Sequence, residues 1–190
     1  MKSCLIVIDA QESFRQRPYF TRRDFVPYIA AQNALIEGCI AAGIPIVRIF
    51  HVDGPASASN PFAVESGHVR PLEELARFDA AATFTKHRHS ALVHTGLEAW
   101  LTENGIGRLI VSGIRTEQCC ETTTRHASDL GWTVDYVIDA TLTFDMVQPD
   151  GRPLSAADIK ARTATVLQDR FAQVCSVDEA LARAGAAVAA

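Results

Sequence analysis

The feature that most constrains the fold is a regular alternation between short apolar runs and segments with helical spacing. The first run, Cys4 to Ile8, is apolar at every position, as expected for a central parallel strand covered on both faces. Further strands are predicted at residues 44–50, 81–85, 108–112, 132–138 and 172–175. Helices are predicted between them at residues 24–43, 71–78, 95–104, 117–130 and 155–168, with a final one from residue 178.

Repeated strand and helix units with short connections predict an α/β fold, in which an open, mostly parallel six-stranded sheet lies between two layers of helices. Asp24, Thr116 and Ser155 are the expected helix caps. No repeat or linker divides the chain, so residues 1–190 are expected to form one domain. Residues 52–69, rich in Gly, Pro, Ser and Asn, are expected to form a long functional loop.

Composition excludes several classes of partner. The chain has 18 Lys and Arg against 22 Asp and Glu, a net charge of −4, and no basic stripe, so we expect no nucleic-acid partner. The first apolar run reaches Asp9 too early for a signal peptide and no run approaches membrane-spanning length, so we expect no membrane partner. Five cysteines without framework spacing indicate reduced thiols, and hence a cytoplasmic protein.

Three chemically unusual residues are predicted to meet at one edge of the sheet. Asp9 follows the first strand, Lys86 the third, and Cys119 lies just beyond the fourth. Ligands of open parallel sheets bind outside the carboxyl ends of the strands, which is this edge. A helix N-terminus and the Lys86 charge would both favour the thiolate form of Cys119. The three residues therefore predict a nucleophilic thiol with a cation beside it.

An acyl-transfer reaction would use these groups without a metal or cofactor. Asp9 could accept the thiol proton and later deliver it to a leaving amine. The backbone N–H groups of Cys119 and Arg115 could hold the oxyanion of a tetrahedral intermediate.

Three segments carry a resemblance to a known family. Residues 9–14 (DAQESF) resemble the D-x-Q-x-x-F segment of the isochorismatase-like cysteine hydrolases, residues 86–91 (KHRHSA) their K-x-x-x-S-A segment, and residues 113–119 (GIRTEQC) their G-x-x-T-x-x-C turn. The resemblance implies a Rossmann-like fold of the isochorismatase type and an Asp9, Lys86 and Cys119 triad. It also implies hydrolysis of a small amide or ureido substrate through a covalent acyl-enzyme, with ammonia or an amine leaving first.

The same resemblance implies further features. Family members commonly have a non-proline cis peptide that would map to Ile114-Arg115, an aromatic residue in the pocket that would map to Phe14, and homo-oligomeric assembly. Two positions depart from the family pattern: Cys120, where an aliphatic residue is usual, and Leu92, where Phe is usual.

Other interpretations remain open. Some isochorismatases cleave a vinyl ether without a cysteine, and replacing Cys119 would then hardly matter. A redox or non-enzymatic flavodoxin-like module could use Cys119 and the adjacent Cys120, although vicinal cysteines in a helix point to different faces. His51, Asp53 and His68 could hold a metal, but they lack fixed ligand spacing, and we expect none there.

Overall fold

The computed structural model describes residues 1–188 and has a parallel sheet at its centre. Its six strands lie in the order β3-β2-β1-β4-β5-β8, and each neighbouring pair is parallel. The strands are β1 (Lys2–Ile8), β2 (Ile46–His51), β3 (Ala82–Lys86), β4 (Ile106–Ile114), β5 (Thr133–Leu142) and β8 (Gln173–Cys175). The alanine-rich composition of residues 185–190 predicts fraying, but α5 (Val177–Val188) continues through residue 188. Residues 189–190 lie outside the described residues.

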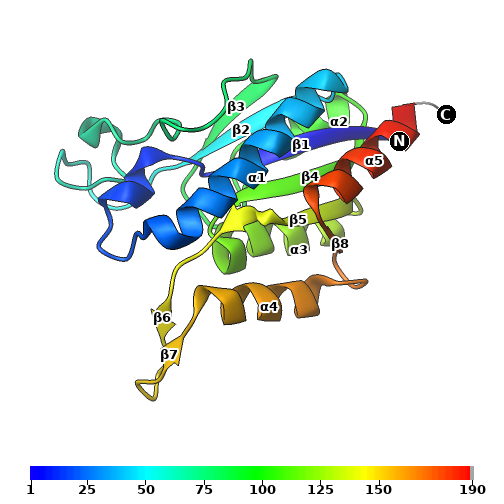
Figure 1. Cartoon of the computed structure of the whole chain (residues 1–190). Helices are drawn as coiled ribbons and strands as arrows, with labels where there is room; N and C mark the ends of the chain where they lie inside the picture. The colour runs from blue at the N-terminus through cyan, green and yellow to red at the C-terminus, as the bar shows by residue number, and fades with distance from the viewer. Residues whose placement is uncertain (189–190) are drawn as a thin grey trace.

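Helices cover both faces of the sheet (Figure 1). One face is packed by α1 (Arg22–Ala41) and α5 (Val177–Val188), and the other by α2 (Leu97–Glu103), α3 (Glu121–Asp129) and α4 (Ala156–Leu167). The apolar positions of β1 divide between the two cores, Leu5 and Val7 on the α1 side and Cys4, Ile6 and Ile8 on the other. This explains why the first strand is apolar at every position.

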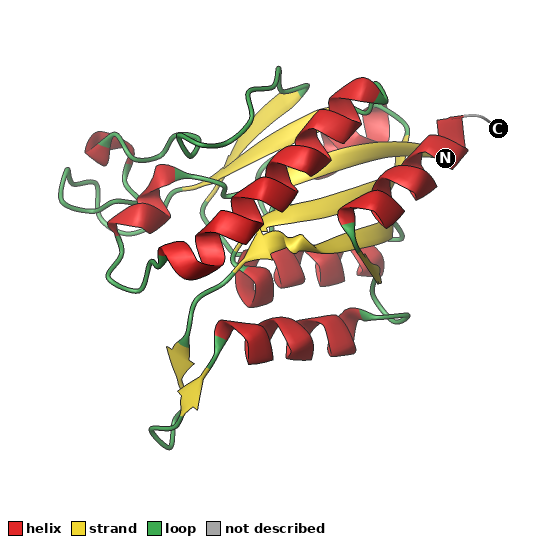
Figure 2. Cartoon of the chain, in the orientation of Figure 1, coloured by secondary structure: helices red, strands yellow, loops and turns green. Residues whose placement is uncertain are grey.

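Several local predictions differ from the structure. Residues 71–78 form no helix, because backbone contacts hold the segment to its neighbours: Leu72 N donates to Ala10 O, and Pro71 bridges to Gln11. The first helix begins at Arg22, one turn earlier than predicted, and its N-cap is Thr21. Two short antiparallel strands, β6 (Met146–Val147) and β7 (Pro153–Leu154), form a hairpin where a plain loop was expected (Figure 2).

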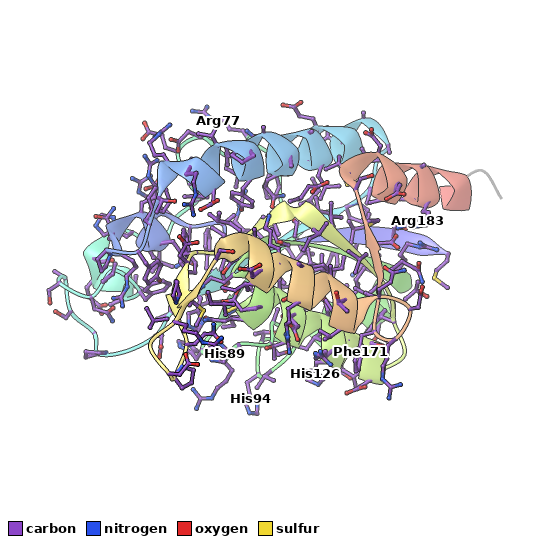
Figure 3. All side chains as sticks on the ribbon, turned by 60° about the horizontal axis from the view of Figure 1, so that its bottom comes forward. Arg77, His89, His94, His126, Phe171 and Arg183 are labelled. Atoms are coloured by element: carbon purple, nitrogen blue, oxygen red, sulfur yellow. The ribbon has the colours of Figure 1, made fainter. Side chains whose placement is uncertain are left out.

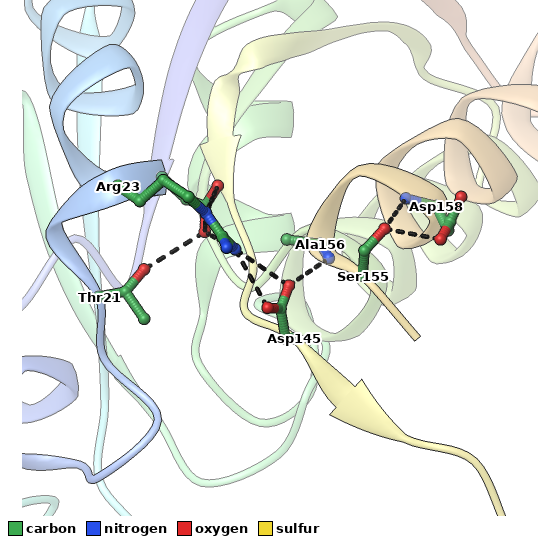
Figure 4. A network of polar contacts seen from close by, with 7 residues as sticks. Thr21, Arg23, Asp145, Ser155, Ala156 and Asp158 are labelled. Atoms are coloured by element: carbon green, nitrogen blue, oxygen red, sulfur yellow. Dashed lines mark hydrogen bonds and ion pairs between the residues drawn. The ribbon is translucent and has the colours of Figure 1, made fainter. Parts of the chain in front are cut away.

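A polar network joins the start of α1 to the start of α4 (Figure 4). Arg23 Nη2 donates to Asp145 at 3.1 Å, and Asp145 Oδ1 accepts from Ala156 N at 2.8 Å. The Ser155 side chain accepts from Asp158 N at 3.1 Å, which confirms Ser155 as the N-cap of α4. None of the helices in residues 1–188 has the length and hydrophobicity needed to cross a membrane.

The strand ends at the functional edge approach one another through Gly113. Its φ is 125°, and it pairs with Ile8 across β1 and β4. A Cβ at this position would overlap the carbonyl oxygen of Ile8. Glycine is therefore required where the strand that carries Asp9 meets the strand that leads to Cys119.

We expect Gly113→Ala to destabilise the fold by about 3 kcal/mol, because the added methyl group meets backbone and the φ value is unfavourable for alanine. Gly43→Ala is the matched control: its φ is also positive, at 64°, but nothing lies within 4 Å of the added Cβ. The control should lose only about 1 kcal/mol. Urea unfolding of both variants measures the difference, and equal losses would contradict the role given to the Ile8 contact.

Candidate active site

The structure brings Asp9, Lys86 and Cys119 together. Lys86 Nζ lies 2.7 Å from Asp9 Oδ2 and donates to Cys119 Sγ at 3.2 Å. Asp9 and Lys86 are fully buried, and Cys119 is 5% exposed. Asp9 directly follows β1 in the left-handed region (φ 50°), a conformation that Asp tolerates better than most residues. The lysine ammonium thus lies between a carboxyl and a thiol.

The turn that carries Cys119 is a single π-helical turn, Thr116–Cys120 (η3), and it begins directly after the cis peptide bond Ile114-Arg115. The cis bond confirms the expectation from the family resemblance. Thr116 is not the N-cap: Arg115 holds that position without a side-chain cap. The Thr116 hydroxyl instead donates to Thr141 Oγ1 at 2.9 Å, and its carbonyl accepts from the Tyr136 hydroxyl at 2.7 Å. Contacts with β5 therefore fix the turn.

Contacts on α3 fix the segment that follows Lys86. Ala91 N donates to Thr123 Oγ1 at 2.9 Å, and Ser90 Oγ lies 2.9 Å from His126 Nδ1. His126 lies on α3, the helix that continues from the Cys119 turn (Figure 3). This gives the Ser-Ala pair of the lysine segment a structural role, since it ties the end of β3 to the helix behind the thiol.

The electrostatics of the thiol differ from the sequence prediction. Burial raises the pKa of Cys119 to about 12, and the negative charge of Asp9 adds to the increase, while Lys86 offsets only part of it. Burial also raises the pKa of the Asp9 carboxyl despite the neighbouring ammonium. Burial alone would lower the pKa of Lys86, but Asp9 and Cys119 outweigh it and leave that pKa raised. The predicted preference for thiolate was wrong, because desolvation exceeds the effect of the cation.

This result predicts the alkylation behaviour of the free protein. Because the thiol pKa is about 12, the reaction of Cys119 with iodoacetamide should be slow at pH 7 and should accelerate about tenfold per pH unit up to about pH 10. Peptide mass spectrometry can follow the modification of Cys119, with circular dichroism as the check that the fold persists. A rate that levels off below pH 8 would show a stabilised thiolate and contradict the prediction.

Two residues support the cluster in roles that the sequence did not predict, since Gln11 was given none and His51 was considered only as a metal ligand. Gln11 ties the end of β1 to the end of β2, since its Nε2 donates to His51 O at 3.0 Å and its Oε1 accepts from His51 N at 2.8 Å. The His51 ring places Nδ1 3.1 Å from Lys86 Nζ. Burial and the Lys86 charge lower the pKa of His51 to about 4, so the ring is neutral and can accept from the ammonium. The pairing of His51 with Lys86 across β2 and β3 is the signal that could have identified it.

A cavity of about 250 Å³ opens beside the thiol. Cys119 and Arg115, the two predicted oxyanion donors, both line it, and so does Phe14. Phe14 is also packed in the core, where the centroid of its ring lies 5.1 Å from the centroid of the Phe62 ring. The loop of residues 52–69 contributes Asp53, Gly54, Asn60 and Phe62 to the wall, as expected of a functional loop.

The histidines near the site do not form a metal centre with the predicted alternative ligands. His51 contacts Lys86, whereas Asp53 Oδ1 accepts from Gly54 N and the carbonyl of His68 accepts from Ser13. In residues 1–188 no group of three or more His, Cys, Asp and Glu side chains is placed to hold a metal ion. His89 lines the cavity, with Nδ1 3.9 Å from Cys119 Sγ.

The fold and the cluster place the protein in one structural class: open parallel α/β proteins with a buried carboxyl, lysine and thiol at the carboxyl edge of the sheet. The model of the isochorismatase domain matches residues 3–178. Because this match covers most of the chain, the protein belongs to the isochorismatase family of hydrolases.

Individual relatives agree with this assignment. The chain is 29% identical over 185 residues to the uncharacterized isochorismatase family protein YrdC of Bacillus subtilis, covering 94% of both chains. The crystal structure of a putative isochorismatase from Burkholderia xenovorans is 30% identical and superposes with a TM-score of 0.87, covering 97% of this chain and 88% of that one. A segment of 60 residues is 42% identical to Nicotinamidase 3 of Arabidopsis thaliana, covering 32% of this chain and 30% of that protein. The predicted α/β fold is confirmed.

Proposed function

We propose that this protein hydrolyses the C–N bond of a small amide or ureido compound through a thioester on Cys119. The observation that carries the proposal is the position of Lys86 Nζ, 2.7 Å from Asp9 Oδ2 and 3.2 Å from Cys119 Sγ. Cys119 lines the cavity, and the other two residues are fully buried. A carboxyl of raised pKa beside a protonated thiol is suited to take its proton when a substrate arrives. The segment shared with a nicotinamidase supports the same chemistry.

The reaction would proceed in two halves. Cys119 Sγ attacks the carbonyl carbon while its proton passes to Asp9, and the backbone N–H groups of Arg115 and Cys119 hold the oxyanion. Collapse of the intermediate breaks the C–N bond, and Asp9 returns the proton to the leaving ammonia or amine. Water then attacks the thioester, Asp9 accepts a proton from it, and the acid leaves as the thiol is restored. Lys86 keeps its charge throughout and stabilises the carboxylate.

The test is ammonia release from a panel of small primary amides and ureido acids, measured with the purified protein. Release from at least one member, at a rate that depends on Cys119, is the expected result. No release from any member would overturn the proposed reaction.

A second candidate is hydrolysis of a vinyl ether, favoured by the family model that the chain matches. Release of pyruvate from isochorismate that persists when Cys119 is replaced would establish this reaction instead. The redox alternative has less support, because Cys120 is fully buried in the core and both cysteines are free thiols. Self-association and a cytoplasmic location stay predictions. The molar mass of the purified protein, measured by light scattering during size-exclusion chromatography, tests the first.

A further inference from the structure

His89 is the solvent-exposed member of the group of side chains around the Cys119 sulfur. Its Nδ1 lies 3.9 Å from Cys119 Sγ, and its ring borders the cavity. Lys86 donates to the same sulfur at 3.2 Å, but Lys86 and Asp9 are both fully buried. The sulfur therefore contacts an ammonium group in the interior and an imidazole that solvent can reach.

Neighbouring contacts hold the His89 ring in place. The next residue, Ser90, is tied to α3, because its Oγ lies 2.9 Å from His126 Nδ1. The His51 ring stacks against the His89 ring, with centroids 6.4 Å apart and planes 17° from parallel. His51 is itself held at 3.1 Å from Lys86 Nζ. An imidazole supported in this way is preorganised to hold a small molecule beside the sulfur.

The two halves of the proposed reaction need different groups at the sulfur. In the first half, the thiol proton passes to Asp9, and the buried groups suffice. In the second half, a water must enter from the cavity and be held against the carbon of the thioester. Among the side chains that line the cavity, His89 is the one whose polar atom contacts Cys119 Sγ within residues 1–188. A neutral imidazole offers one nitrogen that can accept a hydrogen bond from such a water.

We propose that His89 Nδ1 accepts a hydrogen bond from the water that hydrolyses the thioester and so positions this water for attack. The proposal rests on the proposed function and adds a residue to its second half. The water oxygen bonds to the acyl carbon, and the bond from that carbon to sulfur breaks. One hydrogen of the water passes to Asp9 and then to the Cys119 sulfur. The other hydrogen, held by His89, stays on the acid that leaves.

The test uses p-nitrophenyl acetate, which can acylate Cys119 without protonation of its leaving group and so isolates the second half of the reaction. His89→Phe keeps a ring that can stack on His51 but removes both nitrogens. His89→Asn retains an amide oxygen that can accept a hydrogen bond near the position of Nδ1. His87→Phe is the matched control, since His87 is exposed on the same segment, contacts the carbonyl of Val52 and does not line the cavity.

The expected change lies in the release of the acyl group. His89→Phe should keep the initial burst of p-nitrophenol, but its steady rate should fall at least about tenfold below that of the wild type. Mass spectrometry of the intact protein and of its peptides should then find an acetyl group accumulated on Cys119. His89→Asn should recover part of the steady rate, and His87→Phe should behave as the wild type.

The other outcomes separate this proposal from the proposed reaction. Loss of the burst in His89→Phe would place His89 in the first half and overturn the proposal. A steady rate equal to that of the wild type, with no accumulated acetyl group, would also overturn it. Both results leave the thioester reaction in place, provided that release depends on Cys119. Equal release from Cys119→Ala would overturn the thioester reaction and the proposal with it.

Discussion

Cys119→Ala should abolish turnover of any amide substrate, by at least about 10³-fold, and leave the fold intact. The substitution removes the atom that would carry the acyl group, and neither Asp9 nor Lys86 can replace it as a nucleophile while they are paired at 2.7 Å. The stability loss should stay near 1 kcal/mol, because the side chain is small and borders a cavity that already exists. Ammonia release and the urea midpoint measure the two effects.

Cys120→Ala is the matched control for this experiment. Cys120 lies one residue further along the same turn, but it is fully buried in the hydrophobic core. Its removal should reduce stability by about 1 kcal/mol and retain turnover. Turnover that survives in Cys119→Ala would remove the thioester from the mechanism and favour the vinyl-ether reaction.

The central strand β1 could be predicted because burial on both faces makes Cys4 to Ile8 apolar at every position. Segments whose conformation depends on contacts with residues distant in the sequence could not be predicted in this way. Residues 71–78 have a composition that permits a helix, but their place is set by backbone bonds to Ala10 and Gln11. The hairpin of β6 and β7 is too short to give a period that a sequence pattern reveals.

The candidate site could be predicted as a set of residues, since parallel strands bring their carboxyl ends to one edge. The protonation state of its charged groups could not be predicted. The thiol pKa depends on how completely Cys119 is desolvated, and that is a property of the packed molecule. Arg17 carried no signal in the sequence, because an arginine in a loop is usually solvated, and only the folded structure places it on the wall of the cavity.

Lys86→Met should be the most destabilising change at the site and should also abolish turnover. Both side chains of the Lys86 and Asp9 pair are fully buried, at 0% exposure. Methionine fills a similar volume but leaves the Asp9 carboxylate in the interior without a counter-charge, a situation that costs about 3–5 kcal/mol. Urea unfolding at pH 8 measures the loss. A loss below 1 kcal/mol would show that the ion pair contributes little to the fold.

The pH dependence identifies Asp9 as the cause of this loss. Burial already raises the Asp9 pKa above its ordinary value of 3.8, and removing the ammonium raises it further. A carboxyl whose pKa is higher in the folded than in the unfolded state stabilises the fold most when it is protonated, and this stability is lost as the pH rises through the folded-state pKa. The deficit of Lys86→Met should therefore be smaller at pH 5 than at pH 8.

Adding Asp9→Asn should recover much of the stability at pH 8, because Asn tolerates the positive φ and carries no charge, but it should recover no turnover. A deficit that is independent of pH and persists in the double variant would assign the loss to packing of the lysine side chain and not to the uncompensated carboxylate.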